Sequence, residues 1–274
     1  MKQKQALFVD LSFEDLKSQF SKACIVIPTY NESKNIIPLL DKIFDESYDN
    51  KETGIALEVL VVDDNSPDGT ALLVEEYKKT NSNGPNVHLL LRTKKEGLGA
   101  AYIHGMKYAL VEFNPDYIME MDADGQHNTE DIYRLLNGLE EGADFVIGSR
   151  YVKGGSVPDG WGWHRKLISW CAGTVTKVGL GIKGVKDCSG GFRAIRAEVL
   201  RGIDLDRLYV KGYAFQVALL EAAFRENFIV TEVPIHFDER TEGESKMRFS
   251  DMMEGWKLIY KVRKERLKKF MFRL

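Results

Sequence analysis

Oxygen-bearing side chains are crowded in the stretch MEMDADGQHN, residues 119–128. Asp122 and Asp124 lie two positions apart after an apolar run, and Gln126 follows two positions later. If the extended conformation of a strand continues to residue 124, both carboxylates point to one face of a sheet, and Gln126 follows them. Such oxygen ligands suit a hard divalent cation, Mg²⁺ or Mn²⁺, whose shell is completed by substrate phosphates. The alternative is a helix start, with Asp124 or Asn128 as the N-cap and Asp122 solvated.

The elements that position these residues are predicted by the alternation of apolar runs and helical patterns in the first two-thirds of the chain. The predicted strands are 23–28, 57–63, 87–92, 117–122 and 144–148, and the predicted helices are 33–46, 68–80, 97–111 and 129–141. Strands that alternate with helices favour a mostly parallel sheet covered by helices on both faces. In such sheets the ligand site forms at the carboxyl ends of the strands.

Polar loops follow four of the predicted strands, at 28–32, 63–70, 92–100 and in the stretch after residue 120. All four are predicted to emerge on one edge of the sheet and to form a site there. The alternative is local capping, with Asn31 or Ser33 starting one helix and Ser66 or Asp68 the next. The chain contains no P-loop sequence, and GLGAAYIHG at 97–105 lacks the spacing of a dinucleotide-binding loop.

The charge of the chain is unevenly distributed. The net charge is −3 over 274 residues, yet residues 246–274 carry ten Lys or Arg against three acids, and the rest carries 28 basic and 38 acidic residues. A basic tail on an acidic body predicts an anionic surface as the partner of that end. The three cysteines, Cys24, Cys171 and Cys188, have no paired spacing, which favours a reducing compartment and excludes a zinc motif. No nucleic-acid partner is predicted.

Eight motifs occur in order over about residues 22–247: PTYNE (28–32), VVDDNSPDGT (61–70), GLGAAYIHGMKYA (97–109), MDADGQH (121–127), GSRYVKGG (148–155), DCSGGFRAIRAEVL (187–200), KGYAFQ (211–216) and EVPIHFDERTEGESKM (232–247). Together they resemble the dolichol-phosphate (polyprenol-phosphate) mannose synthases, which are family 2 glycosyltransferases. The resemblance implies an α/β fold of the GT-A (Rossmann-like) type, with a mostly parallel sheet flanked by helices. It divides the chain into an N-terminal extension (1–21), a GT-A domain (22–247) and a basic amphipathic helical tail (248–274).

The resemblance also implies the donor site. GDP-mannose is the expected donor, with Mg²⁺ or Mn²⁺ bridging its diphosphate. Asp124 and Gln126 are then the expected metal ligands, and Asp122 faces the sugar nucleotide beside the ion. The remaining nucleotide-sugar positions are Pro28, Tyr30, Glu32, Asp63, Asp64 and Ala123. His127 is expected to be a packing residue, because its spacing from Gln126 turns it to the opposite face.

The acceptor implied by the resemblance is a dolichyl or other polyprenyl monophosphate. A phosphomonoester is already ionised near neutral pH, so cations are needed rather than a strong general base. Arg150, Arg165 and Ser169 match the positions that hold the lipid phosphate, and Arg240 and Lys246 match those that reach the pyrophosphate. The alternative for Arg150 and Arg165 is a surface ion pair or a solvated side chain. Arg193 either contacts the substrate or supports the site, and Gly190, Gly191 and Gln216 either contact mannose or shape the acceptor wall.

The predicted reaction is a single inverting displacement, in which the acceptor phosphate attacks C1 of mannose and GDP departs. Asp122, Asp124, Arg240 and Lys246 are the expected catalytic residues. Three competing interpretations remain open: a polyprenyl-phosphate glucosyltransferase that uses UDP-glucose, a metal-dependent phosphohydrolase, and a non-catalytic scaffold that binds sugar nucleotides or membranes.

Apolar residues recur near helical spacing from residue 249 onward, with lysines and arginines between them. This pattern is typical of an amphipathic helix at a membrane surface, and the alternative is a terminal helix docked on its own domain. No stretch reaches the ~18 apolar residues of a membrane span, and no secretory signal is evident. The expected location is therefore peripheral, on the cytoplasmic face of the endoplasmic reticulum in a eukaryote or of the plasma membrane in a prokaryote. Whether a small membrane-spanning subunit is also needed is left open.

Overall fold

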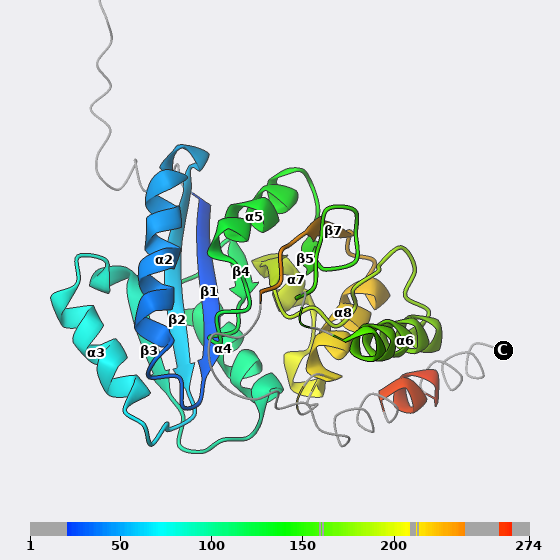
Figure 1. Ribbon diagram of the computed structural model, residues 1–274, viewed down its shortest axis with the longest axis horizontal. Coiled ribbons are helices and arrows are strands. Elements are labelled where there is room, and N and C mark those ends of the chain that lie inside the picture. Colours follow the sequence, from blue (N-terminus) through cyan, green and yellow to red (C-terminus); the bar gives the residue numbers. More distant parts are fainter. Residues whose placement is uncertain are drawn as a thin grey trace, which may run out of the picture.

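A seven-stranded sheet runs through the computed structural model, with strand order β3-β2-β1-β4-β6-β5-β7 (Figure 1). The structure describes residues 21–158, 160, 162–208, 212, 214–238 and 258–264, and for residues 164–172 only their place in a helix. The strands are β1 (Ser21–Thr29), β2 (Ile55–Asp63), β3 (Val87–Leu91), β4 (Tyr117–Glu120), β5 (Phe145–Ser149), β6 (Arg193–Arg196) and β7 (Val230–Pro234). The α-helices are α2 (Ile36–Asp49), α3 (Thr70–Thr80), α4 (Leu98–Glu112), α5 (Ile132–Glu140), α6 (Trp163–Leu180), α7 (Ala197–Gly202) and α8 (Ala214–Arg225).

The directions of the strands determine on which edge of the sheet the polar loops lie. β1 pairs in parallel with β2 and β4, β2 pairs in parallel with β3, and β5 pairs in parallel with β7. β6 alone runs antiparallel, between β4 and β5. All other strands therefore point the same way and end on one edge of the sheet. This arrangement confirms the predicted mostly parallel sheet flanked by helices.

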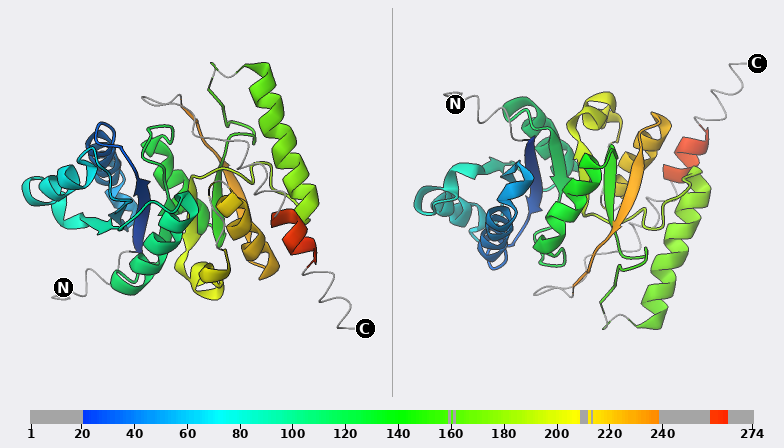
Figure 2. Two further views of the ribbon diagram at one scale, coloured as in Figure 1. Left: turned by 90° about the horizontal axis from the view of Figure 1, so that it is seen from below. Right: turned by 90° about the horizontal axis from the view of Figure 1, so that it is seen from above.

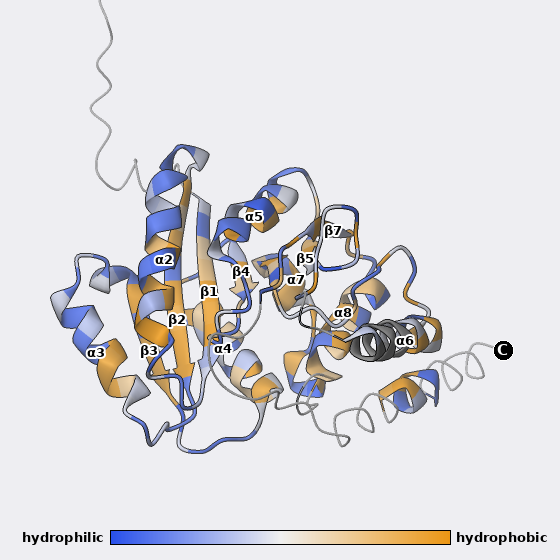
Figure 3. Ribbon diagram, viewed as in Figure 1, coloured by the Kyte–Doolittle hydropathy of each residue, from blue (hydrophilic) through white to orange (hydrophobic). Residues whose placement is uncertain are grey.

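Alternating side chains of the strands supply both halves of the core. On β1, Ala23, Ile25 and Ile27 belong to the core cluster that α2, α3 and α5 cover, whereas Cys24 and Val26 belong to the cluster that α4 and α8 cover. β1 and β2 are hydrophobic over most of their length (Figure 3). Burial on both faces is the reason that the strands of a parallel sheet read as nearly continuous apolar runs.

All five predicted strands and all four predicted helices are present, with shifted ends. The apolar pattern does not predict β6 and β7, because charged residues interrupt their short sequences, RAIR and VTEVP. The predicted strand 117–122 ends earlier, at Glu120, although the amide of Met121 still donates to the carbonyl of Val26. Residues 123–125 then bend, and Gly125 has a φ of 76°. The extended geometry that would align Asp122 with Asp124 therefore does not persist.

The C-terminal helix is described over residues 258–264, and it lies beside α6 in both views of Figure 2. Leu258, Ile259 and Val262 are buried against the domain, and Nε of Arg263 donates to the carbonyl of Gly179 in α6. Over these residues the docked alternative is correct. None of the described helices is long and apolar enough to cross a membrane. Residues 1–20 and the rest of the predicted tail lie outside the described residues.

Candidate active site

Hydrogen bonds join the first two polar loops at the sheet edge. The amides of Asn31, Glu32 and Ser33 donate to the side chains of Ser66, Thr70 and Asp68, respectively, at 3.0–3.1 Å. The N-caps of α2 and α3 are instead Asn35 and Gly69, and neither makes a side-chain cap bond. The polar residues of these loops therefore bind the neighbouring loop. Asp68 also makes a local contact at the start of α3, because its Oδ1 accepts from the amide and the hydroxyl of Thr70.

Asp63 and Asp64 have different surroundings at the end of β2. Asp63 is fully buried and accepts hydrogen bonds from Thr29 Oγ1 and from both the amide and the hydroxyl of Ser66. Asp64 is 5% exposed and accepts from Nη1 of Arg92 at 2.6 Å. Burial raises the pKa of Asp64, and the charge of Arg92 opposes that rise. Asp63 thus orders the loop, while Asp64 is tied to the loop that follows β3.

The other predicted nucleotide residues lie on the same part of the edge. Pro28, Tyr30 and Glu32 are half-buried, and the Glu32 carboxylate accepts from Nδ2 of Asn35 at 2.8 Å. Nζ of Lys95, from the loop after β3, lies 3.7 Å from the centre of the Tyr30 ring. The first three loops thus form one polar surface beside the end of β4.

A cavity adjoins this surface. Its lining comes from the start of α4, the loop after β4, the ends of β5 and β7, the segment before β6, and α8: Leu98, Asp122, Gln126, His127, Arg150, Ser189, Gly190, Gly191, Gln216, Ile235 and Phe237. Asp124 and Ala123 are buried next to it, without lining it. The cavity therefore combines a predicted donor-side carboxylate, Asp122, with a predicted acceptor-side cation, Arg150.

Asp122 is held from two sides. The hydroxyl of Tyr102 donates to its Oδ1 at 2.9 Å, and its own amide donates to Nδ1 of His127 at 3.1 Å. Oδ2 lies 3.6 Å from the point that a β-carbon on Gly191 would occupy, so this oxygen faces the cavity wall that Gly191 forms. Burial, and then the charge of Asp122, raises the pKa of Tyr102, which keeps the phenol protonated as a donor.

His127 lines the same cavity as Asp122 and Gln126, so the expectation that it turns to the opposite face is wrong. The bend at residues 123–125 breaks the alternation on which that expectation rested. As expected, His127 does pack, because its ring stacks on Phe192 with centroids 4.8 Å apart. Burial lowers its pKa to about 4, so the ring is neutral and Nδ1 accepts the Asp122 amide.

Hydrogen bonds of Asp124 and Gln126 hold the rest of the loop after β4. Oδ1 of Asp124 accepts from the amide of Gln126, and Nε2 of Gln126 donates to the carbonyl of Asp238 after β7. Asn128 caps the short helix at Thr129–Asp131 by accepting from the amide of Glu130, so the capping alternative holds for Asn128 and not for Asp124.

The described residues contain no group of three or more His, Cys, Asp or Glu side chains arranged to hold a metal ion. Asp122 and Gln126, which line the cavity, and Asp124, which is buried next to them in the chain, nonetheless offer hard oxygen atoms. Such a small donor set fits a cation that takes its other ligands from substrate phosphates.

Arg150 follows β5, lines the cavity and forms an ion pair with Asp187. Its Nε and Nη2 donate to the two carboxylate oxygens of Asp187 at 2.7 and 2.8 Å. Arg165 and Ser169 belong to α6, at positions where only the helix itself is described. Arg240 and Lys246 lie outside the described residues.

The sequence left the roles of Arg193 and Gln216 open. Arg193 is fully buried, and its guanidinium donates to the carbonyls of Cys188, Gly190 and Gln216, so it supports the segment that carries the cavity wall. Oε1 of Gln216 is buried and has no hydrogen-bond partner among the described residues. Only their motifs, SGGFR and YAFQ, mark these residues in the sequence.

The chain matches a known protein family and is similar to several named proteins. Residues 24–204 match the family described as Glycosyl transferase family 2. The chain is 42% identical over 234 residues to the polyprenol monophosphomannose synthase of Mycolicibacterium smegmatis, covering 85% of this chain and 84% of that protein. It is 44% identical over 223 residues to the undecaprenyl-phosphate mannosyltransferase of Micrococcus luteus, covering 81% of this chain and 86% of that protein.

The fold resembles that of mannosyl-3-phosphoglycerate synthase from Rubrobacter xylanophilus, with a TM-score of 0.62 at 18% identity over 95% of this chain and 80% of that one. The two sequence relatives confirm the resemblance to polyprenol-phosphate mannose synthases. The protein is a glycosyltransferase, and it belongs to glycosyl transferase family 2.

Proposed function

We propose that the protein transfers mannose from GDP-mannose to dolichyl phosphate or another polyprenyl monophosphate, which yields polyprenyl-phosphate mannose. The observation that carries the proposal is the meeting of Asp122 and Arg150 in one cavity, in a chain 42% identical to a polyprenol monophosphomannose synthase. Donor and acceptor are both anionic at their reacting ends. A site that offers carboxylates on one side and an arginine on the other suits such a pair, because a divalent ion neutralises the first anion and the arginine the second.

The reaction in this proposal is a single displacement. An oxygen of the acceptor phosphate forms a bond to C1 of mannose, the bond from C1 to the diphosphate breaks, and GDP leaves, so the configuration at C1 inverts. The ionised acceptor needs no general base. Arg150, with Arg165 and Ser169 of α6, holds the acceptor phosphate, and Arg240 and Lys246 stabilise the charge on the leaving diphosphate.

Asp124 and Gln126, with Asp122, would hold Mg²⁺ or Mn²⁺ in this proposal. When bound, such an ion supplies positive charge to the donor diphosphate. The protein itself fixes the bent loop after β4 by two hydrogen bonds. Nε2 of Gln126 donates to the carbonyl of Asp238, and the amide of Asp122 donates to Nδ1 of His127. The nucleotide lies along the surface at Pro28, Tyr30 and Glu32, and the buried Asp63, Asp64 and Ala123 lie beneath it. Oε1 of Gln216, unpaired among the described residues, accepts a sugar hydroxyl.

The lipid acceptor also requires a membrane surface. An apolar groove between α6 and the helix at 258–264 is lined by Thr174, Val175, Val178, Gly179, Ile259 and Arg263. Val178 and the neighbouring Tyr260 are 71% and 69% exposed. We place this end of the molecule at the bilayer, where exposed apolar side chains enter the headgroup region and basic residues attract anionic lipid.

Product formation tests the proposal. A short-chain polyprenyl phosphate is offered with labelled GDP-mannose, UDP-glucose or GDP-glucose, with and without Mg²⁺ or Mn²⁺. The expected result is a lipid-linked product with GDP-mannose only, and only when a divalent ion is present. Product from UDP-glucose in its place would identify the glucosyltransferase alternative, and no product with any donor would defeat the transferase assignment.

Two further measurements separate the parts of the proposal. Asp124→Ala is expected to abolish the ion-dependent activity, and undiminished product would remove Asp124 from the metal site. Retained configuration at C1, or a trapped glycosyl-enzyme, would exclude the single displacement.

Vesicle flotation tests the membrane surface separately. Val178→Asp is expected to weaken binding to anionic vesicles. Leu72→Asp is the matched control, because Leu72 is equally exposed, at 75%, but lies on α3 at the opposite end of the molecule (Figure 1). Equal flotation of the two variants would exclude α6 from the membrane surface.

A further inference from the structure

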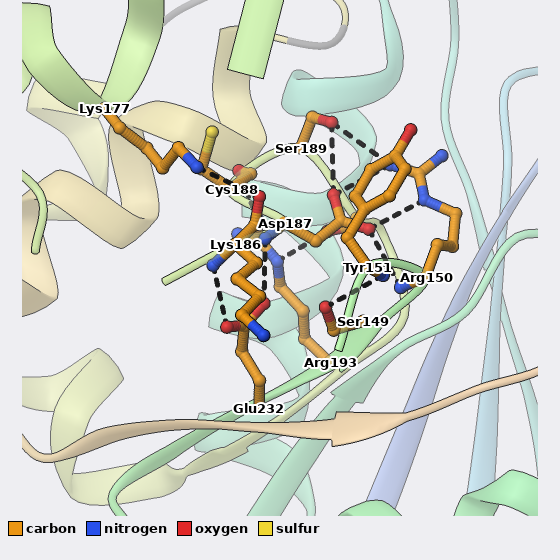
Figure 4. A network of polar contacts seen from close by, with 11 residues as sticks. Ser149, Arg150, Tyr151, Lys177, Lys186, Asp187, Cys188, Ser189, Arg193 and Glu232 are labelled. Carbon is orange, nitrogen blue, oxygen red and sulfur yellow. Dashed lines mark hydrogen bonds and ion pairs between the residues drawn. The ribbon is translucent and has the colours of Figure 1, made fainter. Parts of the chain in front are cut away.

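Arg150 is fixed along one edge of its guanidinium group. Nε and Nη2 donate to the two oxygens of Asp187, and the backbone amide of Arg150 also donates to Oδ2 of that residue at 3.2 Å. Nη2 additionally contacts the hydroxyl of Ser189 at 3.2 Å. Figure 4 shows Asp187 and Ser189 together on this side of the arginine. Arginine is therefore held in a bidentate pair, the geometry that fixes both position and orientation.

Asp187 is itself anchored to the sheet. The amides of Lys186 and Asp187 donate to the two carboxylate oxygens of Glu232 at 2.7 and 2.8 Å, and Glu232 belongs to β7 (Figure 4). β7 pairs in parallel with β5, the strand that Arg150 follows. A continuous chain of contacts thus runs from β7 through Glu232 and Asp187 to the guanidinium group, and rigid elements bound it at both ends.

The ion pair of Arg150 and Asp187 is almost completely buried. Asp187 is 1% exposed, and the side chain of Arg150 is 11% exposed. Burial alone would raise the pKa of Asp187, but the charge and hydrogen bonds of Arg150 outweigh it and hold that pKa below its ordinary value. Both groups therefore stay charged, and removing either leaves its partner uncompensated in a nearly dry environment.

The opposite edge of the guanidinium group carries Nη1, which is not used in the bonds to Asp187 and Ser189. Nη1 donates no hydrogen bond within the described part of the chain, and the planar geometry of the group directs it away from Asp187. The rings of Tyr151 and Phe237 lie 5.4 and 5.2 Å from the Arg150 guanidinium carbon. Arg150 and Ser189 both line the cavity that contains Asp122.

We infer that Asp187 is a positioning residue for the acceptor: it holds Arg150 so that the Nη1 edge meets the phosphate of the incoming polyprenyl phosphate. The inference rests on the proposed function and deepens it. Asp187 does not touch the substrate. It fixes the direction of a long side chain that would otherwise have many rotamers, and it does so without closing the edge that faces the cavity.

The test is a steady-state kinetic comparison of full-length Asp187→Asn with wild type, in which the two substrates are varied separately. The KM for short-chain polyprenyl phosphate is expected to rise about tenfold or more, which corresponds to the loss of one well-placed charged contact. The KM for GDP-mannose is expected to stay within about twofold, because the donor surface lies on the other loops. Equal increases in both KM values, or a fall in kcat alone, would overturn the inference.

A double-mutant cycle shows whether Asp187 acts through Arg150. Arg150→Lys keeps the charge but loses the bidentate fork. If Asp187 acts through Arg150, adding Asp187→Asn to Arg150→Lys raises the acceptor KM by much less than it does in wild type. Fully additive effects would refute the positioning role. An unchanged acceptor KM in Arg150→Lys, with activity intact, would instead refute the assignment of Arg150, and an inactive wild type would refute the proposed function.

Two more variants keep the result interpretable. Glu232→Gln loosens the anchor of Asp187 from outside the cavity, so it is expected to shift the acceptor KM in the same direction by a smaller factor, even if Asp187→Asn folds poorly. An acceptor KM equal to wild type in a folded Glu232→Gln would contradict the chain of contacts. Asp144→Asn is the matched control: Asp144 also faces an arginine, Arg196, and accepts a backbone amide, from Ile229, but precedes β5 at the opposite edge. Its acceptor KM is expected to match that of wild type.

Discussion

The hydroxyl of Tyr102 donates a hydrogen bond of 2.9 Å to Oδ1 of Asp122, across 20 residues of chain. Tyr102 comes from α4, and its ring lies nearly parallel to that of Phe215 in α8, with an interplanar angle of 9°. A rigid, fully buried aromatic ring therefore sets the direction of the carboxylate that faces the cavity. The direction of the Asp122 carboxylate therefore depends on the packing of two helices as well as on the motif that contains it.

Tyr102→Phe is expected to lower kcat/KM without disturbing the fold. The substitution keeps the ring and removes one hydrogen bond to a charged group, which contributes about 1.5–3 kcal/mol, so the loss of activity is roughly tenfold to a hundredfold. Tyr117→Phe is the matched control, because its hydroxyl also binds a carboxylate, that of Glu140, remote from the cavity. Equal activity of the two variants would show that the Tyr102 hydrogen bond does not serve the reaction.

Gly191→Ala is expected to fold normally and to impair substrate binding. A β-carbon there would lie 3.6 Å from Asp122 Oδ2 and from Gln216 Nε2, which are ordinary contact distances, so it would occupy cavity space without a clash. Gly190→Ala differs, since its β-carbon would lie 3.0 Å from the carbonyl oxygen of Gly148. The temperature of thermal unfolding should therefore fall in Gly190→Ala only, whereas the substrate KM should rise in Gly191→Ala. Wild-type kinetics in Gly191→Ala would mean that the reaction does not use this cavity.

Arg193 and Glu120 are expected to be coupled in stability. Both are fully buried, with Arg193 Nε 3.7 Å from Glu120 Oε2. Burial raises the pKa of Glu120 to about 7 and lowers that of Arg193. Arg193→Met removes one partner and three hydrogen bonds to carbonyls, and it is expected to cost about 3–5 kcal/mol of the free energy of unfolding.

The double variant Arg193→Met/Glu120→Gln should lose less than the sum of its single variants, by about 1 kcal/mol or more, in urea denaturation. Strict additivity would contradict the coupling. Asp206→Asn serves as the control, because its ion pair with Lys107 is on the surface and its removal should change stability by less than about 0.5 kcal/mol.

His127 gives a pH dependence of known sign. Its pKa is lowered from 6.5 to about 4, chiefly by burial, so between these values the unfolded chain binds the proton and the folded chain does not. Stability is therefore complete above pH 6.5 and falls as the pH drops toward 4, by about 2 kcal/mol at pH 5 for this one group. His127→Gln has no titratable side chain at this position. The free energy of unfolding of wild type, relative to that of the variant, should therefore fall by about 2 kcal/mol between pH 7 and pH 5. Parallel pH profiles in denaturant unfolding would show that the lowered pKa is wrong.

The sequence by itself determined the sheet edge on which the site forms. β2 is a nearly continuous apolar run that ends at Asp63. A strand that is buried on both faces is apolar at nearly every position, so the early strands can be recognised from their own residues. The four polar loops and the position of Asp122 follow from that pattern, whereas Arg150 was identified through the family resemblance. These features depend on residues adjacent in the chain, where spacing and side-chain type suffice.

The tertiary structure alone decided how the side chains meet. β6 enters antiparallel between β4 and β5, which brings Asp187 to Arg150 across 37 residues and Gly191 to Asp122. The bend after β4 turns His127 into the cavity, where alternation had placed it outside. Such contacts join segments distant in sequence, and they are selected by packing, charge pairing and the satisfaction of buried polar groups over the whole fold, which no local pattern encodes.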